Sequence, residues 1–246
     1  GDYDPSAENR QPRRRKRHLM NVKSLPSPNH GPRPDGVAPS LLILHYTGMR
    51  DAAAALARLT DPASEVSAHY TVDEDGTIYA HVDEERRAWH AGVARWRGEG
   101  DVNSRSVGVE IVNPGHDFGY RPFPAAQMRA VADLSKAIMA RWGIRPRDVL
   151  AHSDVAPTRK QDPGELFDWP WLAAQGVGVS PAPTPADFNG PCDEAELRRL
   201  LAAAGYDADA PLSAALTAFQ RHFLPQKLGL AADAETLAVL RALTRA

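Results

Sequence analysis

The chain has 246 residues, a formal net charge of −2, 43% hydrophobic residues and one cysteine. This length suffices for one good-sized domain and a smaller one. The near-neutral charge argues against a general nucleic-acid binder. Because Cys192 is the single cysteine, an internal disulfide framework and a thiolate-rich metal site are excluded. No apolar run approaches the roughly 20 residues needed to span a bilayer, and no signal-peptide core is visible. We therefore expect no membrane insertion.

The first 24 residues are polar, rich in proline and poor in large apolar side chains. We expect residues 1–24 to be a disordered tail or an engineered extension, with Met20 as a candidate native start. The basic run Arg13–His18 is the one feature that would suit a nucleic-acid or phosphate ligand, and a solvated tail is the favoured interpretation.

The first strong element is Leu41–Leu44, a short continuous apolar run that predicts a buried strand. His45 follows at its end, where a metal ligand would point into a cleft. A core histidine hydrogen-bonded to the backbone is the alternative. Asp51 has the position of an N-cap for an alanine-rich helix that runs to about Leu59.

Two β-prone runs flank Asp75-Gly76, which predicts a hairpin. His69 lies in the first run, and we rank a supporting or core role for it above a ligand role. His81 lies in the second run and is predicted to be an exposed member of a cross-strand pair. The loop that follows contains Trp89, which we interpret as a substrate wall or as an anchor of the loop in the core.

A second strong strand is predicted from Ser106 to Val112, where apolar residues alternate with Gly108 and Glu110. Gly108 permits the close approach of another group to the backbone. Because a buried carboxylate is costly unless it is paired or protonated, Glu110 needs a cation or a proton. This makes Glu110 the most informative residue of the chain.

The second half of the chain divides into three predicted parts. Apolar spacing indicates a helix from Pro124 to Trp142, ended by Gly143. Residues 177–191 have the composition of a linker. Three short helical patterns at about 193–204, 211–222 and 233–244 predict a small three-helix domain. The expected division is therefore a catalytic domain at 25–176, a linker at 177–191 and a helical domain at 192–246.

The segment from Ala151 to Gly164 concentrates chemically reactive side chains. A short strand at 148–151 would place His152 at a sheet edge. Because Pro157 and Pro163 forbid a continuous helix, we expect Lys160 and Asp162 to lie in an ordered loop. His45, His152 and Asp162 would leave the fourth position of a zinc ion to water. Glu110 would then take a proton from that water, and Lys160 would stabilise an oxyanion. The residues themselves favour a zinc hydrolase, although spacing alone does not show that they converge.

Several blocks with fixed internal spacing resemble the zinc N-acetylmuramoyl-L-alanine amidases, which share their fold with the peptidoglycan recognition proteins. The blocks are Leu-His45-Tyr-Thr, Ser-x-His69-Tyr, Ala-Trp89-His90-Ala-Gly, Ser-Val-Gly-Val-Glu110-Ile and His152-Ser-Asp-Val-Ala-Pro-x-Arg-Lys160-x-Asp162-Pro-Gly. The resemblance covers roughly residues 25–175. It implies an α/β fold with a central mixed β-sheet flanked by helices.

The resemblance also implies a chemistry. His45, His152 and Asp162 become ligands of Zn²⁺, Glu110 the base and Lys160 the residue that stabilises the transition state. The reaction would hydrolyse the amide between the lactyl group of N-acetylmuramic, or 1,6-anhydro-N-acetylmuramic, acid and L-alanine of the stem peptide. The positions that fall where the family lines its groove are Tyr46, Trp89, His90, Asn113 and Arg159. Arg159 would hold a stem-peptide carboxylate, or else pair with Asp154.

The C-terminal helices resemble, more weakly, a peptidoglycan-binding domain whose usual Asp-Gly turns are missing here. A recognition protein that holds muropeptides without cleaving them is the main alternative, and the complete ligand set argues against it. A zinc peptidase is less favoured because no His-Glu-x-x-His motif exists. We expect a monomer that acts on muropeptides in wall recycling in the cytoplasm, or on the sacculus if it resides in the periplasm.

Overall fold

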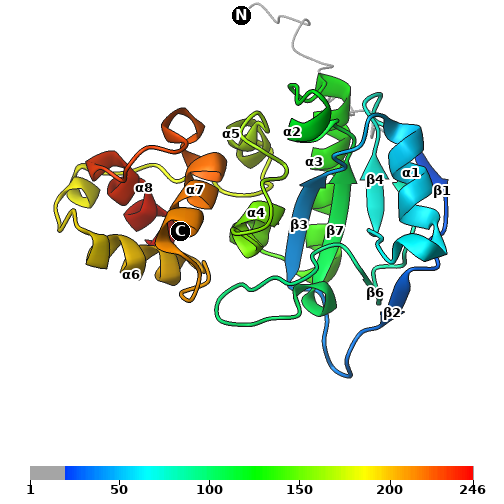
Figure 1. Cartoon of the computed structure of the whole chain (residues 1–246), viewed down its shortest axis with the longest axis horizontal. Coiled ribbons are helices and arrows are strands. Elements are labelled where there is room, and N and C mark those ends of the chain that lie inside the picture. Colours follow the sequence, from blue (N-terminus) through cyan, green and yellow to red (C-terminus); the bar gives the residue numbers. More distant parts are fainter. Residues whose placement is uncertain (1–19, 246) are drawn as a thin grey trace, which may run out of the picture.

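The computed structural model describes residues 20–245, which form a mixed sheet, a second small sheet and helices around them (Figure 1). The main sheet has six strands in the order β1-β5-β4-β7-β3-β8. Only the β4–β5 pair is antiparallel. The strands are β1 (Val22–Ser24), β3 (Leu41–Tyr46), β4 (Tyr70–Val72), β5 (Ile78–Ala80), β7 (Ser106–Ile111) and β8 (Val149–Ala151), and the antiparallel pair β2 (His30–Pro32) and β6 (Arg86–Ala88) stands apart. The predicted fold class is confirmed.

The α-helices of the described chain are α1 (Ala52–Thr60), α2 (Gly115–Phe118), α3 (Ala125–Trp142), α4 (His152–Val155), α5 (Trp169–Ala174), α6 (Glu194–Ala204), α7 (Leu212–Phe223) and α8 (Ala234–Arg245). Short 3₁₀ turns are η2 (Pro62–Ser64), η3 (Val102–Arg105), η4 (Pro146–Asp148), η5 (Pro185–Phe188) and η6 (Pro225–Lys227). None of these helices combines the length and apolar character needed to cross a bilayer.

The alternation of side chains along β3 decides which face of the sheet carries the site. Leu42 and Leu44 pack in one hydrophobic cluster with the long helix α3. Leu41 and Ile43 pack in a second cluster with residues of the C-terminal helices. Because successive side chains of a strand point to opposite faces, His45 shares the face of Leu41 and Ile43. The end of β3 thus directs His45 away from α3.

Local sequence signals explain the boundaries of the elements. The Asp51 carboxylate accepts a hydrogen bond from the Ala54 N–H at 2.8 Å and begins α1. Gly143, with a φ of 68°, ends α3 in the left-handed conformation that glycine adopts without strain. The β4–β5 hairpin turns through residues 73–77, where Asp75 accepts from the Thr77 N–H at 2.8 Å. These predictions are confirmed.

The three C-terminal helices form at the predicted places and pack against the rest of the chain. Their buried residues, such as Leu200, Phe219 and Leu240, belong to the same hydrophobic cluster as Leu41 and Ile43 of β3. Figure 1 shows α6, α7 and α8 gathered beside α4 and α5, on the side of the sheet where β3 lies. The division at 177–191 remains a prediction, since the core is continuous across it.

Two predictions about the N-terminal part are wrong. Residues 22–24 are not a tail, because β1 pairs in parallel with β5. Val22 is exposed there, so main-chain hydrogen bonds rather than an apolar pattern hold the strand. His81 is not a surface residue but is 4% exposed; its Nδ1–H donates to the Leu25 carbonyl at 2.7 Å and its Nε2 accepts from the Thr71 hydroxyl at 2.8 Å. The basic run 13–18 lies outside the described residues.

Candidate metal centre and active site

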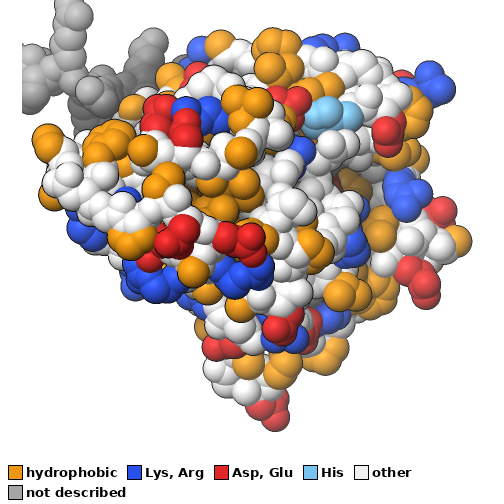
Figure 2. All heavy atoms as spheres, turned by 60° about the vertical axis from the view of Figure 1, so that its left-hand side comes forward, with side chains coloured by type: hydrophobic (Ala, Val, Ile, Leu, Met, Phe, Trp, Pro, Cys, Tyr) orange, Lys and Arg blue, Asp and Glu red, His pale blue; other side chains and the backbone are white. Residues whose placement is uncertain are grey.

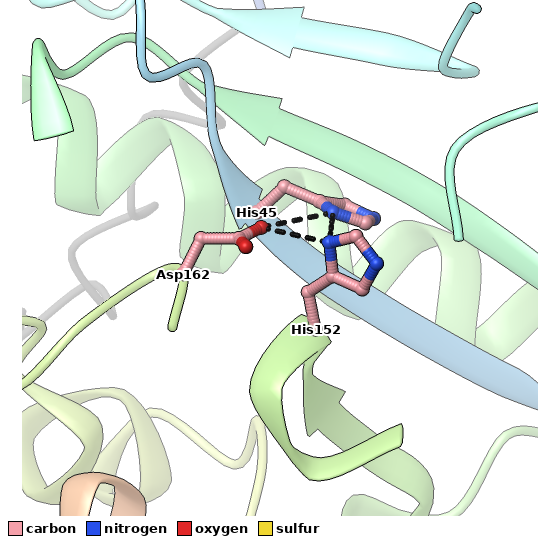
Figure 3. Close-up of side chains that lie close together, drawn as sticks. All are labelled: His45, His152 and Asp162. Carbon is pink, nitrogen blue, oxygen red and sulfur yellow. Dashed lines mark hydrogen bonds and ion pairs between the residues drawn. The ribbon is translucent and has the colours of Figure 1, made fainter. Parts of the chain in front are cut away.

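Three side chains from distant parts of the sequence meet at the end of β3. His45 is in β3, His152 begins α4 directly after β8, and Asp162 lies in the loop that follows. The two Nδ1 atoms are 2.9 Å apart, and Asp162 Oδ2 lies 3.1 Å from His45 Nδ1 and 3.0 Å from His152 Nδ1 (Figure 3). All three residues are buried. The expectation that they converge is therefore fulfilled.

The three donor atoms fit a zinc ion. Ligand atoms about 2.0–2.1 Å from a tetrahedral zinc stand roughly 3.3 Å from one another. The observed separations of 2.9–3.1 Å come close to that triangle. Two imidazoles and one carboxylate also form a donor set that leaves one tetrahedral position open, as catalytic zinc sites require.

The tautomer of His152 suits a ligand. Its Nε2 lies 3.0 Å from the Ala91 carbonyl oxygen, which can only accept, so the proton is on Nε2. The Nδ1 lone pair is then free to face the other two donors. A ligating histidine that donates its second nitrogen to a carbonyl is the usual arrangement in metal sites.

The tautomer of His45 follows from a chain of hydrogen bonds behind it. The Ser106 hydroxyl donates to the Val102 carbonyl at 2.6 Å, so its oxygen accepts from His90 Nε2–H at 3.2 Å. His90 Nδ1 must then accept, and it lies 3.0 Å from His45 Nε2, which donates. This leaves the lone pair of His45 on Nδ1, the atom that faces His152 and Asp162. His90 therefore fixes the orientation of the His45 ring.

Gly108 of β7 makes room for His90. A Cβ at this position would lie 2.4–2.6 Å from atoms of the His90 ring, closer than nonbonded atoms approach. The prediction that Gly108 permits a close approach is explained by this ring. Burial lowers the pKa of His90 well below its usual value, with His45 as the next cause, so the ring stays neutral as the hydrogen-bond chain requires.

The charges of the ligands suit metal binding. Burial, and next His152, lowers the pKa of His45 to about 4, so that its imidazole is neutral at physiological pH, as metal binding requires. Burial alone would raise the pKa of Asp162, but the charges and hydrogen bonds of His152 and His45 outweigh it and hold this pKa below its usual value. Asp162 is thus ionised, as a metal ligand must be.

Glu110 lies next to the three donors, because it is the register partner of His45 in the parallel pair β3–β7. Its Oε2 is buried and has no hydrogen-bond partner among the described residues. Burial, and next the charge of Asp162, raises the pKa of Glu110 well above its usual value, while Lys160 opposes the shift. A carboxylate with a raised pKa and an unpartnered oxygen is suited to take a proton.

A groove of about 400 Å³ opens over these residues. It is bordered, as predicted, by Tyr46, Trp89, His90, Arg159 and Lys160, together with Glu110, His152 and Asp162. Lys160 and Arg159 are exposed there. A further cation on the groove is Arg58 of α1, which the sequence analysis did not single out because no motif distinguishes it from other exposed helix residues.

Two expectations about the groove need correction. Asn113 is buried. Its Oδ1 accepts from the Gly115 N–H at 3.0 Å, and its Nδ2–H donates to the Arg121 carbonyl at 2.7 Å, so it holds a turn instead of lining the groove.

Arg159 does not pair with Asp154; it donates to the carbonyls of Ala91 and Val93. His69 has the supporting role that we ranked first, since its Nδ1 accepts from the Gly108 N–H at 2.9 Å.

Two known amidases are similar to this chain in sequence. AmiD of Escherichia coli (strain K12), an N-acetylmuramoyl-L-alanine amidase, is 39% identical over 227 residues, covering 82% of this chain and 81% of the relative. AmpD of Salmonella typhimurium (strain SL1344), a 1,6-anhydro-N-acetylmuramyl-L-alanine amidase, is 32% identical over 173 residues, covering 63% of this chain and 90% of the relative.

Solved structures agree with the sequence relatives. E. coli AmiD in complex with the substrate anhydro-N-acetylmuramic acid-L-Ala-D-gamma-Glu-L-Lys has a TM-score of 0.76 and 38% identity, and the match covers 87% of this chain and 92% of that one. AmpDh3 from Pseudomonas aeruginosa in complex with anhydromuramic pentapeptide has a TM-score of 0.76 and 33% identity, covering 84% of this chain and 91% of that one. The family profile "N-acetylmuramoyl-L-alanine amidase" matches residues 35–165, a range that contains every predicted metal ligand. This chain belongs to the N-acetylmuramoyl-L-alanine amidase family.

Proposed function

We propose that this protein is a zinc-dependent amidase that cleaves the bond between the lactyl group of N-acetylmuramic acid and L-alanine of the stem peptide. The observation that carries the proposal is the triangle of His45, His152 and Asp162, with the unpartnered carboxylate oxygen of Glu110 beside it. A ligand set with one open position and a neighbouring base is the arrangement of a zinc hydrolase.

Each residue then has a role in the reaction. A zinc ion held by the three donors would supply Lewis-acid chemistry and an activated water. Glu110 accepts the proton of the attacking water, because its raised pKa makes it a stronger base than an ordinary glutamate, and returns that proton to the leaving nitrogen. Lys160, on the rim of the groove, places its positive charge near the oxyanion that forms at the carbonyl.

Three cationic side chains on the groove suit an anionic substrate. Arg58, Arg159 and Lys160 border it, and their charges match the carboxylates of a stem peptide. The relatives AmiD and AmpDh3 were solved with anhydromuramic peptides. We therefore propose 1,6-anhydro-muropeptides as substrates. The expectations of a monomer and of a cytoplasmic location remain predictions.

Product analysis by mass spectrometry tests the proposal. Zinc-loaded protein is incubated in separate reactions with 1,6-anhydro-N-acetylmuramyl tripeptide and with intact sacculi. Release of the free tripeptide supports the proposed activity, and release of peptides from sacculi alone would replace the proposed substrate with polymeric wall. The Glu110→Ala variant should keep zinc and fold but lose nearly all turnover, because it removes the base and no ligand. Zinc binding without cleavage of either substrate would favour a muropeptide recognition protein.

A further inference from the structure

Asp154, two residues after the ligand His152, is bonded to the C-terminal helices. Tyr206 donates its hydroxyl to Asp154 Oδ1 at 2.8 Å, and His222 Nδ1–H donates to Asp154 Oδ2 at 2.7 Å. Asp154 is 1% exposed, Tyr206 3% and His222 4%. A buried carboxylate depends on such donors, since an unpaired buried charge is strongly destabilising. The C-terminal helices therefore satisfy a charge that belongs to the metal-ligand loop.

The same carboxylate fixes the turn that carries the ligand. Asp154 Oδ2 also accepts from the Ala151 N–H at 2.8 Å, which closes the first turn of α4 around His152. His152 in turn holds its tautomer through the Ala91 carbonyl. The orientation of the His152 ring thus depends on a turn whose carboxylate is held from the other side by Tyr206 and His222.

A second contact reaches the other end of the loop. Arg221, the neighbour of His222 in α7, has its Nε 3.5 Å from Glu165 Oε2. Glu165 contacts His116 Nε2 at 3.1 Å, and His116 Nδ1 lies 3.0 Å from the hydroxyl of Tyr46 on the groove. Consecutive residues of α7 therefore contact both ends of the segment that contains His152 and Asp162.

The position of α7 is itself well defined. The His222 ring stacks between Trp169 and Phe223, with centroid distances of 3.8 Å to each. A Cβ on Gly205, which precedes Tyr206, would lie 2.6 Å from the Trp96 ring, so this turn packs tightly on the loop before β7. Figure 1 shows α7 beside α4. Such packing leaves α7 little freedom to shift relative to the loop.

The C-terminal helices also carry charged side chains on their surface. On the face in Figure 2, acidic and basic side chains lie next to one another. Arg199 and Glu196 of α6, for example, form an ion pair at 2.7 Å. Among the buried polar residues of α7, Gln220 bonds to Gly229 and Leu230, whereas His222 reaches the loop that carries His152.

We propose that α7 is a positioning element of the amidase site: His222 and Arg221, assisted by Tyr206, hold the loop 152–165 so that His152 and Asp162 present their donor atoms to the metal. The inference rests on the proposed function. It gives the C-terminal helices a part in metal binding that is separate from any contact with the cell wall.

The test uses variants of the full chain and measures zinc affinity by competition with a chromophoric chelator. His222→Phe keeps an aromatic ring between Trp169 and Phe223 but removes the donor to Asp154. We expect zinc affinity to fall about tenfold, at the lower end of the loss that follows removal of a ligand's hydrogen-bond partner, because His222 acts on His152 only through Asp154. His222→Asn should recover part of the loss, because its amide N–H can replace Nδ1–H. Tyr206→Phe, which removes a single oxygen, should weaken zinc binding in the same direction and serves if His222→Phe fails to fold.

Arg241→Ala is the matched control. Arg241 of α8 donates to the Asp187 and Pro191 carbonyls and pairs with Glu196, all within residues 187–241 and away from the metal loop. This variant should lower the unfolding temperature of the metal-free protein and leave zinc affinity unchanged. A merely structural role for His222 predicts the same pattern for His222→Phe.

The outcomes separate the two proposals. Wild-type protein that binds zinc and cleaves muropeptide, together with unchanged zinc affinity in His222→Phe and Tyr206→Phe, would overturn the positioning role and leave the amidase intact. Equal losses of zinc affinity in Arg241→Ala and His222→Phe would also overturn it, because the effect would then be general destabilisation. A wild-type chain that binds no zinc would refute both proposals.

Discussion

The substitution Gly108→Ala tests whether the orientation of His45 depends on its hydrogen bond to His90. The new Cβ would lie 2.4 Å from Cγ and 2.6 Å from Cδ2 and Nδ1 of the His90 ring. Nonbonded carbon atoms prefer about 3.5–4.0 Å, so the ring must retreat by roughly 1 Å. Nδ1 is the atom that accepts from His45 Nε2 at 3.0 Å. The displacement therefore breaks the hydrogen bond that sets the ligand's tautomer.

Two magnitudes follow from this geometry. Overpacking a buried site costs about 1–3 kcal/mol of stability, and loss of a hydrogen-bond partner of a ligand lowers metal affinity about 10- to 100-fold. We expect Gly108→Ala to show both effects, in thermal unfolding of the metal-free protein and in competition for zinc. Gly31→Ala is the matched control, since Gly31 is also in a strand and a Cβ there would meet nothing within 4 Å.

A double-mutant cycle identifies the cause. In a His90→Ala background the ring is absent, so adding Gly108→Ala should have little further effect on zinc affinity. Additive losses in the double variant would mean that Gly108 acts through some other contact. Normal zinc affinity in Gly108→Ala would refute the role assigned to the hydrogen-bond chain.

Three further substitutions test other parts of the description. Asp162→Ala should lower the zinc content measured by elemental analysis, because three protein ligands are the usual minimum of a catalytic site; full occupancy would dismiss the assignment. Ser106→Ala removes the acceptor of His90 Nε2–H, so zinc affinity should fall about tenfold, and an unchanged chelator titration would argue against the tautomer assigned to His90. Burial would raise the pKa of Glu84, but hydrogen bonds from Arg141 and Tyr70 lower this pKa overall. The Glu84 carboxylate therefore stabilises the fold above its ordinary pKa of 4.5, and this stabilisation is lost as the pH falls through the lower pKa of the folded state. Unfolding free energies measured between about pH 5 and pH 3 should therefore decline more steeply for wild type than for Glu84→Gln, and parallel curves would contradict this sign.

Much of the fold was predictable because its strongest signals are local. The apolar run before His45 and the alternation around Glu110 identified the two central strands. The N-cap Asp51 located the start of α1, and Gly143 located the end of α3. In these segments one face is buried, so the hydrophobic period directly reflects the structure. β1 lacked that signal, because Val22 is exposed and the strand is held by its main chain.

The candidate metal ligands could also be selected from sequence, whereas the residues that orient them could not. His45, His152 and Asp162 occur in blocks with recognisable spacing, and the structure brings them together. The function of His90 depends on Ser106 and on the missing Cβ of Gly108, which no short motif connects to it. A residue type alone does not distinguish a groove wall from a hydrogen-bond partner of a ligand.

The C-terminal helices illustrate the same limit over a longer distance. Their apolar spacing predicted that each helix buries one face, and it contained no information about the surface against which that face packs. Asp154 was considered as a partner for Arg159, in the same loop, but its side-chain donors are Tyr206 and His222, 52 and 68 residues further along the chain. Only the tertiary arrangement places Arg221 and His222 against opposite ends of one loop. The consequence is physical: a helix that supplies no ligand can still determine how well the ligands bind their metal.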